Sequence, residues 1–194
     1  MKITRFLLAA VLPMGLAAQQ PTAPLTNPIT TAFRNRTAGL RRNIAQAFDS
    51  IPESKFSYKP TPAQMSIGDI AQHVAADNYF FCNNFGEKKA TLSDKDKNTP
   101  DSVKATWPKD TLVAKLKASN AFCDEAMAQL DDTKIAEIMT VPGPNNTTRQ
   151  VGRVNYTLGH SIDLADHYSQ LANYMRLNGI LPPTALPRPG RGGN

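Results

Sequence analysis

The residues best suited to metal or proton chemistry in this chain are histidines with an aspartate one helical turn away. His167 follows Asp163 by four positions, and Asp77 follows His73 by four. Side chains at i and i+4 lie on one face of an α-helix, so each pair can share an ion or a proton. Imidazole and carboxylate groups are also common ligands of divalent metals. The spacing therefore indicates either a metal site or two intrahelical hydrogen-bonded pairs.

The third histidine, His160, lies on the same predicted helix as His167 but seven residues earlier. Seven helical residues rise about 10.5 Å, which places the two imidazoles poorly for binding one ion directly. We therefore predict that Asp163 and His167 bind the ion together with His73 from another helix. Three protein ligands leave one position open, as in catalytic zinc sites. His160 and Tyr174 are then candidates to support the ligands and to donate or accept a proton nearby.

None of these arrangements requires an ion. Asp77 can orient the His73 imidazole, can bind the same ion, or can make a plain intrahelical hydrogen bond. Asp163 and His167 can pair in the same way, and His160 can bond to a tyrosine. Buried polar groups need such partners, because an unpaired one costs about 1–3 kcal/mol. The residue pattern alone leaves the metal site and a metal-free cluster both open.

The two cysteines, Cys82 and Cys123, allow one disulfide. They do not form a Cys-x-x-Cys pair, so the sequence gives no support to a thioredoxin-like redox role. The functional alternative is a nucleophilic or metal-bound thiolate, which the spacing favours less. We predict a structural disulfide between two neighbouring helices, which an oxidising compartment would preserve.

The first eighteen residues have the features of a secretory signal peptide. Two basic residues precede a short apolar run over 6–16, and small residues follow at Ala17 and Ala18. The run contains Pro13 and is shorter than the roughly 20 apolar residues that span a bilayer. We therefore predict cleavage after residues 1–18 and an exported protein, periplasmic or secreted, without a membrane attachment.

The charge pattern argues against nucleic acid as a partner. The net charge is +6, and it falls to +4 without Lys2 and Arg5 of the leader. Two further arginines, Arg188 and Arg191, lie in the C-terminal tail. The sequence contains no stripe of basic residues with interleaved aromatics, the pattern typical of nucleic-acid binding. The remaining length suits one domain with its own core. An unknown small molecule is the expected partner, and a homodimer is compatible with the sequence.

Helical periodicity organises the first half of the chain. After an extended, proline-containing lead-in over 19–28, apolar residues at helical spacing predict a helix over 29–48 that Thr30 or Thr31 can cap. A second helix opens on Ser66, with Asp69 three residues later in a capping-box pattern, and runs to about residue 84. The polar segment that follows is predicted to be a long loop.

The second half supplies two further helices. The loop over 87–108 leads to a helix that Asp110 is predicted to cap. The segment 141–146 breaks regular structure and is either a hairpin tip or a simple loop. A last helix over 151–178 ends before Gly179, a residue favoured just past helix ends. These elements predict an all-α fold, a four-helix bundle over residues 29–183, followed by a disordered basic tail over 184–194.

Several segments resemble the DinB/YfiT-like superfamily. The nine residues 66–74, Ser-Ile-Gly-Asp-Ile-Ala-Gln-His-Val, resemble the family motif that carries the histidine of the second helix. The segment 56–60 is similar to the stretch before that motif. Residues 167–171 and 174–183 resemble the closing signature of the family. The resemblance extends over most of the chain, from about residue 29 to residue 183.

The resemblance implies a four-helix bundle of DinB/YfiT-like type with a divalent metal ion, most often zinc or nickel, bound by three histidines. His73 matches the first ligand and His167 the last, whereas Asp163 stands where the family has a histidine. Aspartate can ligate zinc, nickel or manganese. The site therefore either binds a harder ion, one that favours oxygen ligands, or is degenerate and metal-free. Some members resemble thiol-dependent transferases and isomerases. We expect a metal-dependent hydrolase or transferase of unknown substrate, or alternatively a non-catalytic binding or structural bundle.

Overall fold

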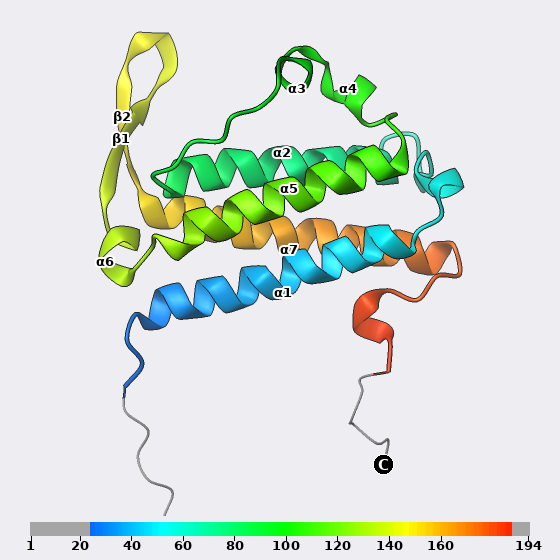
Figure 1. The fold of residues 1–194 in the computed structure, drawn as a ribbon, viewed down its shortest axis with the longest axis horizontal. Helices are drawn as coiled ribbons and strands as arrows, with labels where there is room; N and C mark the ends of the chain where they lie inside the picture. The colour runs from blue at the N-terminus through cyan, green and yellow to red at the C-terminus, as the bar shows by residue number, and fades with distance from the viewer. Residues whose placement is uncertain (1–23, 188–194) are drawn as a thin grey trace, which may run out of the picture.

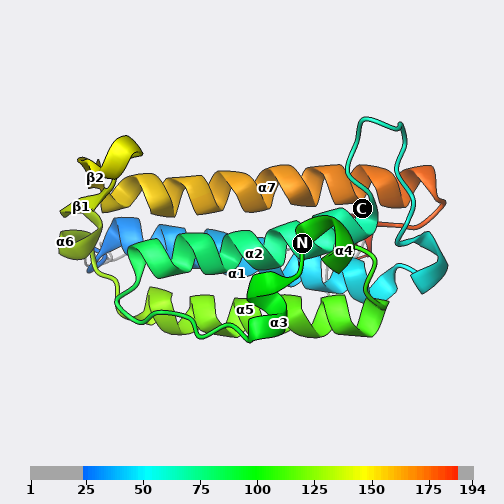
Figure 2. The ribbon, with the colours of Figure 1, turned by 90° about the horizontal axis from the view of Figure 1, so that it is seen from above.

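Four long helices make up most of the computed structural model, which describes residues 24–187. The predicted signal peptide and the residues from 188 onward lie outside this range. The helices run side by side along the long axis (Figure 1), and α7 and α5 lie on opposite sides of α1 and α2 (Figure 2). Their bounds are α1 Pro28–Ser50, α2 Ile67–Phe85, α5 Lys109–Ala128 and α7 Arg153–Leu177. The prediction of a mainly helical chain is confirmed.

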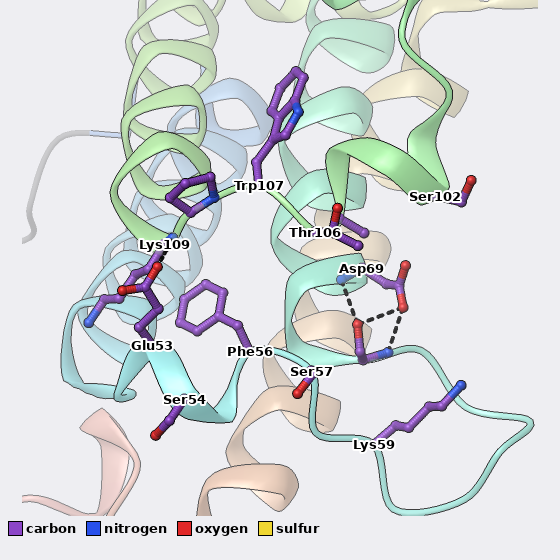
Figure 3. A pocket seen from close by; sticks show the side chains of 13 residues that line it. Glu53, Ser54, Phe56, Ser57, Lys59, Asp69, Ser102, Thr106, Trp107 and Lys109 are labelled. Carbon is purple, nitrogen blue, oxygen red and sulfur yellow. Dashed lines mark hydrogen bonds between the residues drawn. The ribbon is translucent and has the colours of Figure 1, made fainter.

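The start of α2 follows the predicted capping box. The Ser66 Oγ accepts a hydrogen bond from the Asp69 amide at 3.1 Å, and the Asp69 carboxylate accepts one from the Ser66 amide at 2.8 Å. Dashed lines beside Asp69 mark these bonds in Figure 3. Gly68 allows close packing here, because a Cβ atom at this position would lie 2.2 Å from the Ala105 carbonyl oxygen. The sequence thereby fixes where α2 begins and what it packs against.

The start of α1 differs from the prediction. Within residues 24–187 no side chain of the local sequence caps this helix, and its N-cap residue Asn27 adopts a left-handed φ of 54°. The carboxylate of Asp132 takes the place of the cap. It accepts hydrogen bonds from the Ile29 amide at 3.1 Å and from the Thr30 amide and hydroxyl at 2.7 Å each. An anion is favoured at a helix N-terminus, where the first amides lack partners.

The segment predicted to be a loop over 87–108 contains two short helices, α3 Asp94–Asn98 and α4 Asp101–Lys104. Together they arch over α2 and α5 (Figures 1 and 2). Trp107 anchors the arch, since the ammonium groups of Lys95 and Lys115 lie 5.2 and 5.0 Å from its ring centre. Cation–π contacts of this kind stabilise a segment that has little apolar surface of its own.

Asp110 does not cap the third long helix, contrary to the prediction. The helix α5 begins one residue earlier, at Lys109, directly after Pro108. The Lys109 amide donates instead to the Glu53 carboxylate at 3.3 Å. Glu53 belongs to a 3₁₀ turn, Glu53–Lys55, between α1 and α2. As with α1, a distant carboxylate holds the first amide of the helix.

The break over 141–146 is the tip of a hairpin. Strand β1 Ile138–Pro142 pairs antiparallel with β2 Thr148–Gly152, and Thr140 lies opposite Gln150. The hairpin projects from one end of the molecule, beside the short helix α6 Asp132–Ile135 (Figure 1). At its tip, two asparagines adopt left-handed backbone conformations. The fold is therefore all-α except for this small sheet, which the sequence analysis left open.

The face of α7 that carries the histidines is buried, as the helical spacing predicted. His160, Leu164 and Leu171 are fully buried, whereas Leu158 and Ile162 point to solvent. After the helix, Gly179 adopts the predicted positive φ, 72°. None of the helices within residues 24–187 is long and apolar enough to cross a membrane.

Candidate metal centre

The three predicted ligands converge between α2 and α7. Their ligand atoms, from His73, Asp163 and His167, all lie within 4.8 Å of one another. The Asp163 Oδ1 lies 3.3 Å from the His167 Nε2 and 3.9 Å from the His73 Nε2. The two imidazole rings meet edge to face with their centres 4.6 Å apart. The fold therefore brings together, from two helices, two nitrogens and a carboxylate oxygen.

Asp77 adds a second carboxylate to this group. Its Oδ2 lies 3.2 Å from the His73 Nε2, the same nitrogen that faces Asp163. A carboxylate that only oriented the ring would approach the other nitrogen, Nδ1. Asp77 is therefore placed as a further oxygen of the cluster itself.

The cluster is open on one side. The exposed fraction of the side chain falls from 38% for His73 and 27% for Asp77 to 17% for Asp163 and 9% for His167. The α2 residues thus form the entrance and the α7 residues form the floor. A small molecule or an ion can reach the imidazole of His73 from solvent.

A hydrogen-bonded chain sets the tautomer of His167. The Gln170 Nε2 donates to the Tyr174 hydroxyl at 3.1 Å, and this orients the Gln170 Oε1 toward the His167 Nδ1 at 3.3 Å. The Nδ1 therefore carries a hydrogen, and the Nε2 faces the cluster, where it donates to Asp163 when the ring is protonated and presents a lone pair when the ring is neutral. Metal-binding histidines usually have such a partner behind the ring. Tyr174, predicted to exchange protons at the site, is fully buried and reaches His167 only through Gln170.

The charges of the cluster shift its pKa values in opposite directions. Burial raises the pKa of Asp77 to about 6, opposed by His73 and reinforced by Asp163. Burial alone would raise the pKa of Asp163, but the hydrogen bond and charge of His167 hold it below its usual value. Burial likewise opposes protonation of His167, yet Asp163 outweighs it and raises that pKa. The protonation states of Asp77, Asp163 and His167 therefore depend on one another.

One buried atom of the cluster lacks a partner. The Asp163 Oδ2 is inaccessible to solvent and accepts no hydrogen bond within the part of the chain that the structure describes. Buried polar atoms in native proteins nearly always have a partner. A cation bound by His73, Asp163 and His167 would provide one, and nitrogen and oxygen ligands suit several divalent metals. The residues present fit a divalent ion, and they do not select one metal.

His160 does not belong to this cluster, contrary to the prediction. Its ring lies among Phe33, Phe81 and Phe85, with ring centres 5.6 to 6.3 Å away. Its Nε2 lies 2.9 Å from the Asn78 Oδ1, so it bonds neither to a ligand of the candidate ion nor to a tyrosine. About two turns of α7 separate His160 from His167, because seven residues rise about 10.5 Å along the helix.

The predicted disulfide is present and lies beside His160. Cys82 of α2 and Cys123 of α5 are bonded, with their Cα atoms 5.3 Å apart. The sequence analysis missed two polar residues of these sites, Asn78 and Gln170. Gln170 follows His167 by three positions and could have been found from that spacing. Asn78 stands at a buried position of α2, and only the fold shows its partners.

Two cavities of the molecule lie away from this cluster. One, of about 540 Å³, is drawn in Figure 3 and lies where the turn before α2 meets the starts of α2 and α5; its lining includes Glu53, Asp69 and Lys109. Its carboxylates already accept backbone amide hydrogen bonds. The other, of about 610 Å³, lies under the arch beside Trp107. Neither lining contains a candidate ligand, so the chemistry points to the partly exposed cluster between α2 and α7.

Solved structures of similar fold support the architecture. A DinB-like protein from Bacillus cereus matches with a TM-score of 0.60 at 16% identity, over 79% of this chain and 95% of that one. A conserved protein from Enterococcus faecalis matches with a TM-score of 0.56 at 14% identity, over 77% and 96%. A mycothiol-dependent maleylpyruvate isomerase matches with a TM-score of 0.56 at 16% identity, over 73% of this chain and 60% of that one.

The sequence comparisons agree with the fold. No curated protein matches the chain. A family model, described as the DinB superfamily, matches residues 36–171, a segment that runs from α1 to α7 and contains every residue of the candidate metal centre except Tyr174. The match covers well over half of the chain, and the chain therefore belongs to the DinB superfamily.

Proposed function

We propose that α1, α2, α5 and α7 form a four-helix bundle of DinB/YfiT-like type that binds one divalent metal ion. His73, Asp163 and His167 would hold the ion, and the protein would act as a metal-dependent hydrolase or transferase on a small molecule. The observation that carries the proposal is the approach of two imidazole nitrogens to the Asp163 Oδ1, beside an Asp163 Oδ2 that is buried and accepts no hydrogen bond within residues 24–187. A buried carboxylate with one unpaired oxygen is poorly satisfied without a cation.

The residues around the ion have separable tasks. A bound divalent ion supplies Lewis-acid polarisation of a carbonyl or phosphoryl oxygen. Gln170 accepts the hydrogen on the His167 Nδ1, so the Nε2 is the nitrogen left to bind the ion. Asp77 places a carboxylate beside the exposed edge of His73, where it can accept or return a proton of a small molecule. The half-exposed His73 leaves the entrance open.

The second candidate is a metal-free, non-catalytic bundle. Its support is that the histidines and aspartates already satisfy one another in part, at 3.2 Å for His73 with Asp77 and 3.3 Å for His167 with Asp163. In that case the cluster would act as a buried polar network and would hold α2 against α7. Such networks can stabilise a unique packing without any ion.

Metal analysis of untagged protein purified without chelator separates the two candidates. We expect about one divalent ion per chain, with zinc or nickel the first to be sought. The ion should be lost in His73→Ala and in His167→Ala, whereas His160→Gln, the matched change at a histidine outside the cluster, should keep it. Metal far below one per chain that is unaffected by His73→Ala would overturn the proposal.

Thermal unfolding with and without chelator gives a second reading. An ion present at about a hundred times its dissociation constant stabilises the folded state by about 2.7 kcal/mol. The metal-site proposal expects this stabilisation to disappear in His167→Ala. The metal-free candidate expects the chelator to leave the unfolding temperature unchanged.

The cellular setting is also a proposal. Residues 1–18 would direct export and be removed, and mass spectrometry of the mature protein from the periplasm or medium should then find an N-terminus near Gln19. The exposed apolar residues Phe80, Leu158 and Ile162 on α2 and α7 are compatible with a homodimer. Light scattering of the purified protein would test that association.

A further inference from the structure

A second group of metal-binding residue types lies at the hairpin end of the helices. Cys82, Cys123 and His160 offer ligand atoms that all lie within 4.8 Å of one another. All three residues are fully buried. In the oxidised chain the two sulfur atoms are bonded to each other and bind no ion. The group is separate from the cluster of His73, because His160 faces Asn78 and the phenylalanines around it.

The orientation of the Asn78 amide assigns the hydrogens on His160. The Asn78 Nδ2 donates to the Ser119 Oγ at 3.0 Å and to the Asn120 Oδ1 at 2.9 Å. The Ser119 hydroxyl donates to the Leu116 carbonyl, so its oxygen is an acceptor for Asn78. The Asn78 Oδ1 therefore faces His160, and the His160 Nε2 must carry a hydrogen to donate to it at 2.9 Å.

The other ring nitrogen of His160, Nδ1, then carries a lone pair that accepts no hydrogen bond. The His160 Nδ1 is inaccessible to solvent and has no hydrogen-bond partner among residues 24–187. Burial lowers the pKa of His160 to about 3, and the charge of Arg41 lowers it further while Asp163 opposes it. The imidazole thus stays neutral at pH 7, and its Nδ1 is available as a ligand. A buried acceptor without a donor calls for an explanation.

We propose that Cys82, Cys123 and His160 form a redox-gated site that binds one zinc-type divalent cation once the disulfide is reduced. A dithiol reductant donates two electrons and two protons to the disulfide and itself becomes a disulfide, which leaves two thiols on this chain. The two thiols then release their protons to water as their sulfur atoms bind the cation. Oxidation and metal binding therefore exclude each other at this position.

The charge balance favours a divalent cation. Two thiolates and a neutral imidazole cancel a charge of +2, so the occupied site adds no net charge to a fully buried position. Two sulfurs and one imidazole nitrogen are also a known zinc ligand set, with a fourth position left for water. Hard cations prefer charged oxygen ligands, and this group contains no carboxylate.

The backbone already stands close enough for such a site. The Cα atoms of Cys82 and Cys123 are 5.3 Å apart. Tetrahedral ligation at about 2.3 Å per sulfur needs the two sulfurs about 3.8 Å apart, which rotation about the side-chain bonds can provide. The Asn78 carbonyl oxygen, 3.2 Å from the Cys123 Sγ, offers an acceptor to the free thiol. The cation would then join α2, α5 and α7, where the disulfide joins only α2 and α5.

The test uses full-length protein in which His73→Ala and His167→Ala have removed the first candidate metal site. A phosphine reductant opens the disulfide under anaerobic conditions and becomes a phosphine oxide with the oxygen of water, whose hydrogens complete the two thiols. Titration with Co²⁺ should give one equivalent bound, with thiolate-to-cobalt charge-transfer absorption that Zn²⁺ displaces. The oxidised form of the same protein should give neither.

Two variants decide whether all three residues take part. Cys82→Ser with Cys123→Ser should abolish the charge-transfer absorption. His160→Gln, which keeps a side chain able to donate to Asn78, should weaken binding at least about tenfold, the effect that even a lost supporting partner has on metal affinity. Absence of the absorption in the reduced parent, or unchanged affinity in His160→Gln, would overturn the proposal.

The stability of the reduced protein gives an independent reading by circular dichroism. If reduction unfolds the chain, Zn²⁺ should restore the helical signal in the parent and fail to restore it in His160→Gln. If the reduced chain stays folded, Zn²⁺ should raise its unfolding temperature and leave that of the oxidised chain unchanged. Reduced protein that neither refolds nor gains stability with Zn²⁺ contradicts the site.

Discussion

The same helix carries two histidines whose surroundings differ in almost every respect. His167 lies in a partly exposed cluster, where Asp163 raises its pKa. His160 is fully buried among phenylalanines, and this burial lowers its pKa to about 3. In each case a carboxamide occupies one ring nitrogen: Gln170 leaves the Nε2 of His167 to face Asp163, and Asn78 leaves the Nδ1 of His160 without a partner. The residue type alone therefore does not determine what a histidine can bind. Its amide partner and its burial do.

The region around His160 and the region around His167 should differ most when the disulfide beside His160 is removed. Cys82→Ala with Cys123→Ala should lower the free energy of unfolding of the oxidised protein by about 4 kcal/mol, since the bridge closes a loop between residues 41 positions apart. Urea unfolding in the presence of chelator measures this. The metal content of the His73 cluster should stay the same. A loss below about 1 kcal/mol would show that the disulfide region contributes little to the fold.

The buried His160 should make the free energy of unfolding decrease in acid. The unfolded chain protonates His160 near pH 6.5, whereas the folded chain does so only near pH 3. As the pH falls through this window the unfolded state gains the proton first, so stability decreases by about 1.4 kcal/mol per pH unit. Between pH 6.5 and 4.5 the wild type should therefore lose about 2 kcal/mol more than His160→Gln in urea unfolding.

The open cluster should respond to acid in the opposite direction, which provides the control. The pKa of Asp77 is raised from 3.8 to about 6, so in this range the folded metal-free chain takes up a proton that the unfolded chain does not. Stability from this group therefore increases as the pH falls from about 6 to 3.8. Asp77→Asn should remove that gain and steepen the acid loss. Equal slopes in wild type and both variants would contradict both assignments.

Removing the carboxamide behind His167 should affect only the open cluster. Gln170→Leu should weaken binding of the divalent ion by about ten- to a hundredfold, because the imidazole loses the bond that fixes its tautomer. Titration with zinc measures this, and Gln46→Leu on the exposed surface of α1 is the matched control. Unchanged affinity in Gln170→Leu would mean that packing alone orients the ring.

The smallest expected effect concerns the start of α2, near the open cluster and far along the helix from Cys82. Ser66→Ala should cost about 1 kcal/mol, the usual contribution of a serine N-cap. Hydrogen exchange should increase in the first turn of α2 and not around Cys82. Ser93→Ala, which removes the analogous cap of the short helix α3, should cost less global stability. Equal losses would place both caps in one cooperative unit.

Local rules in the sequence predicted much of this structure. The capping box at Ser66, the buried stripe of α7 and the disulfide between Cys82 and Cys123 all follow from spacing within a helix or from residue arithmetic, and all are present. The fold places His73, Asp163 and His167 together, as the spacing and the family resemblance predicted. The identity of an ion and the reaction stay predictions.

The parts that the sequence missed depend on partners far away in the chain. The Asn78 amide lies 82 residues from His160, and no periodicity links the two. Arg41 falls on the buried side of α1, and its two terminal nitrogens bond to Asn120 and Asp124 of α5, so a charged residue is in the interior. Such contacts are specified by the packing of whole helices, which a single pattern does not encode.

The capping of α1 by Asp132 has a consequence for the order in which the chain folds. Its carboxylate lies 102 residues after Thr30, so closing this contact orders a long loop and costs chain entropy. The N-terminus of a helix is the part that frays when its amides lack partners. We expect that α1, although synthesised first, completes its first turn only after α5 and α6 have emerged. The beginning of the domain is then among the last parts to fold.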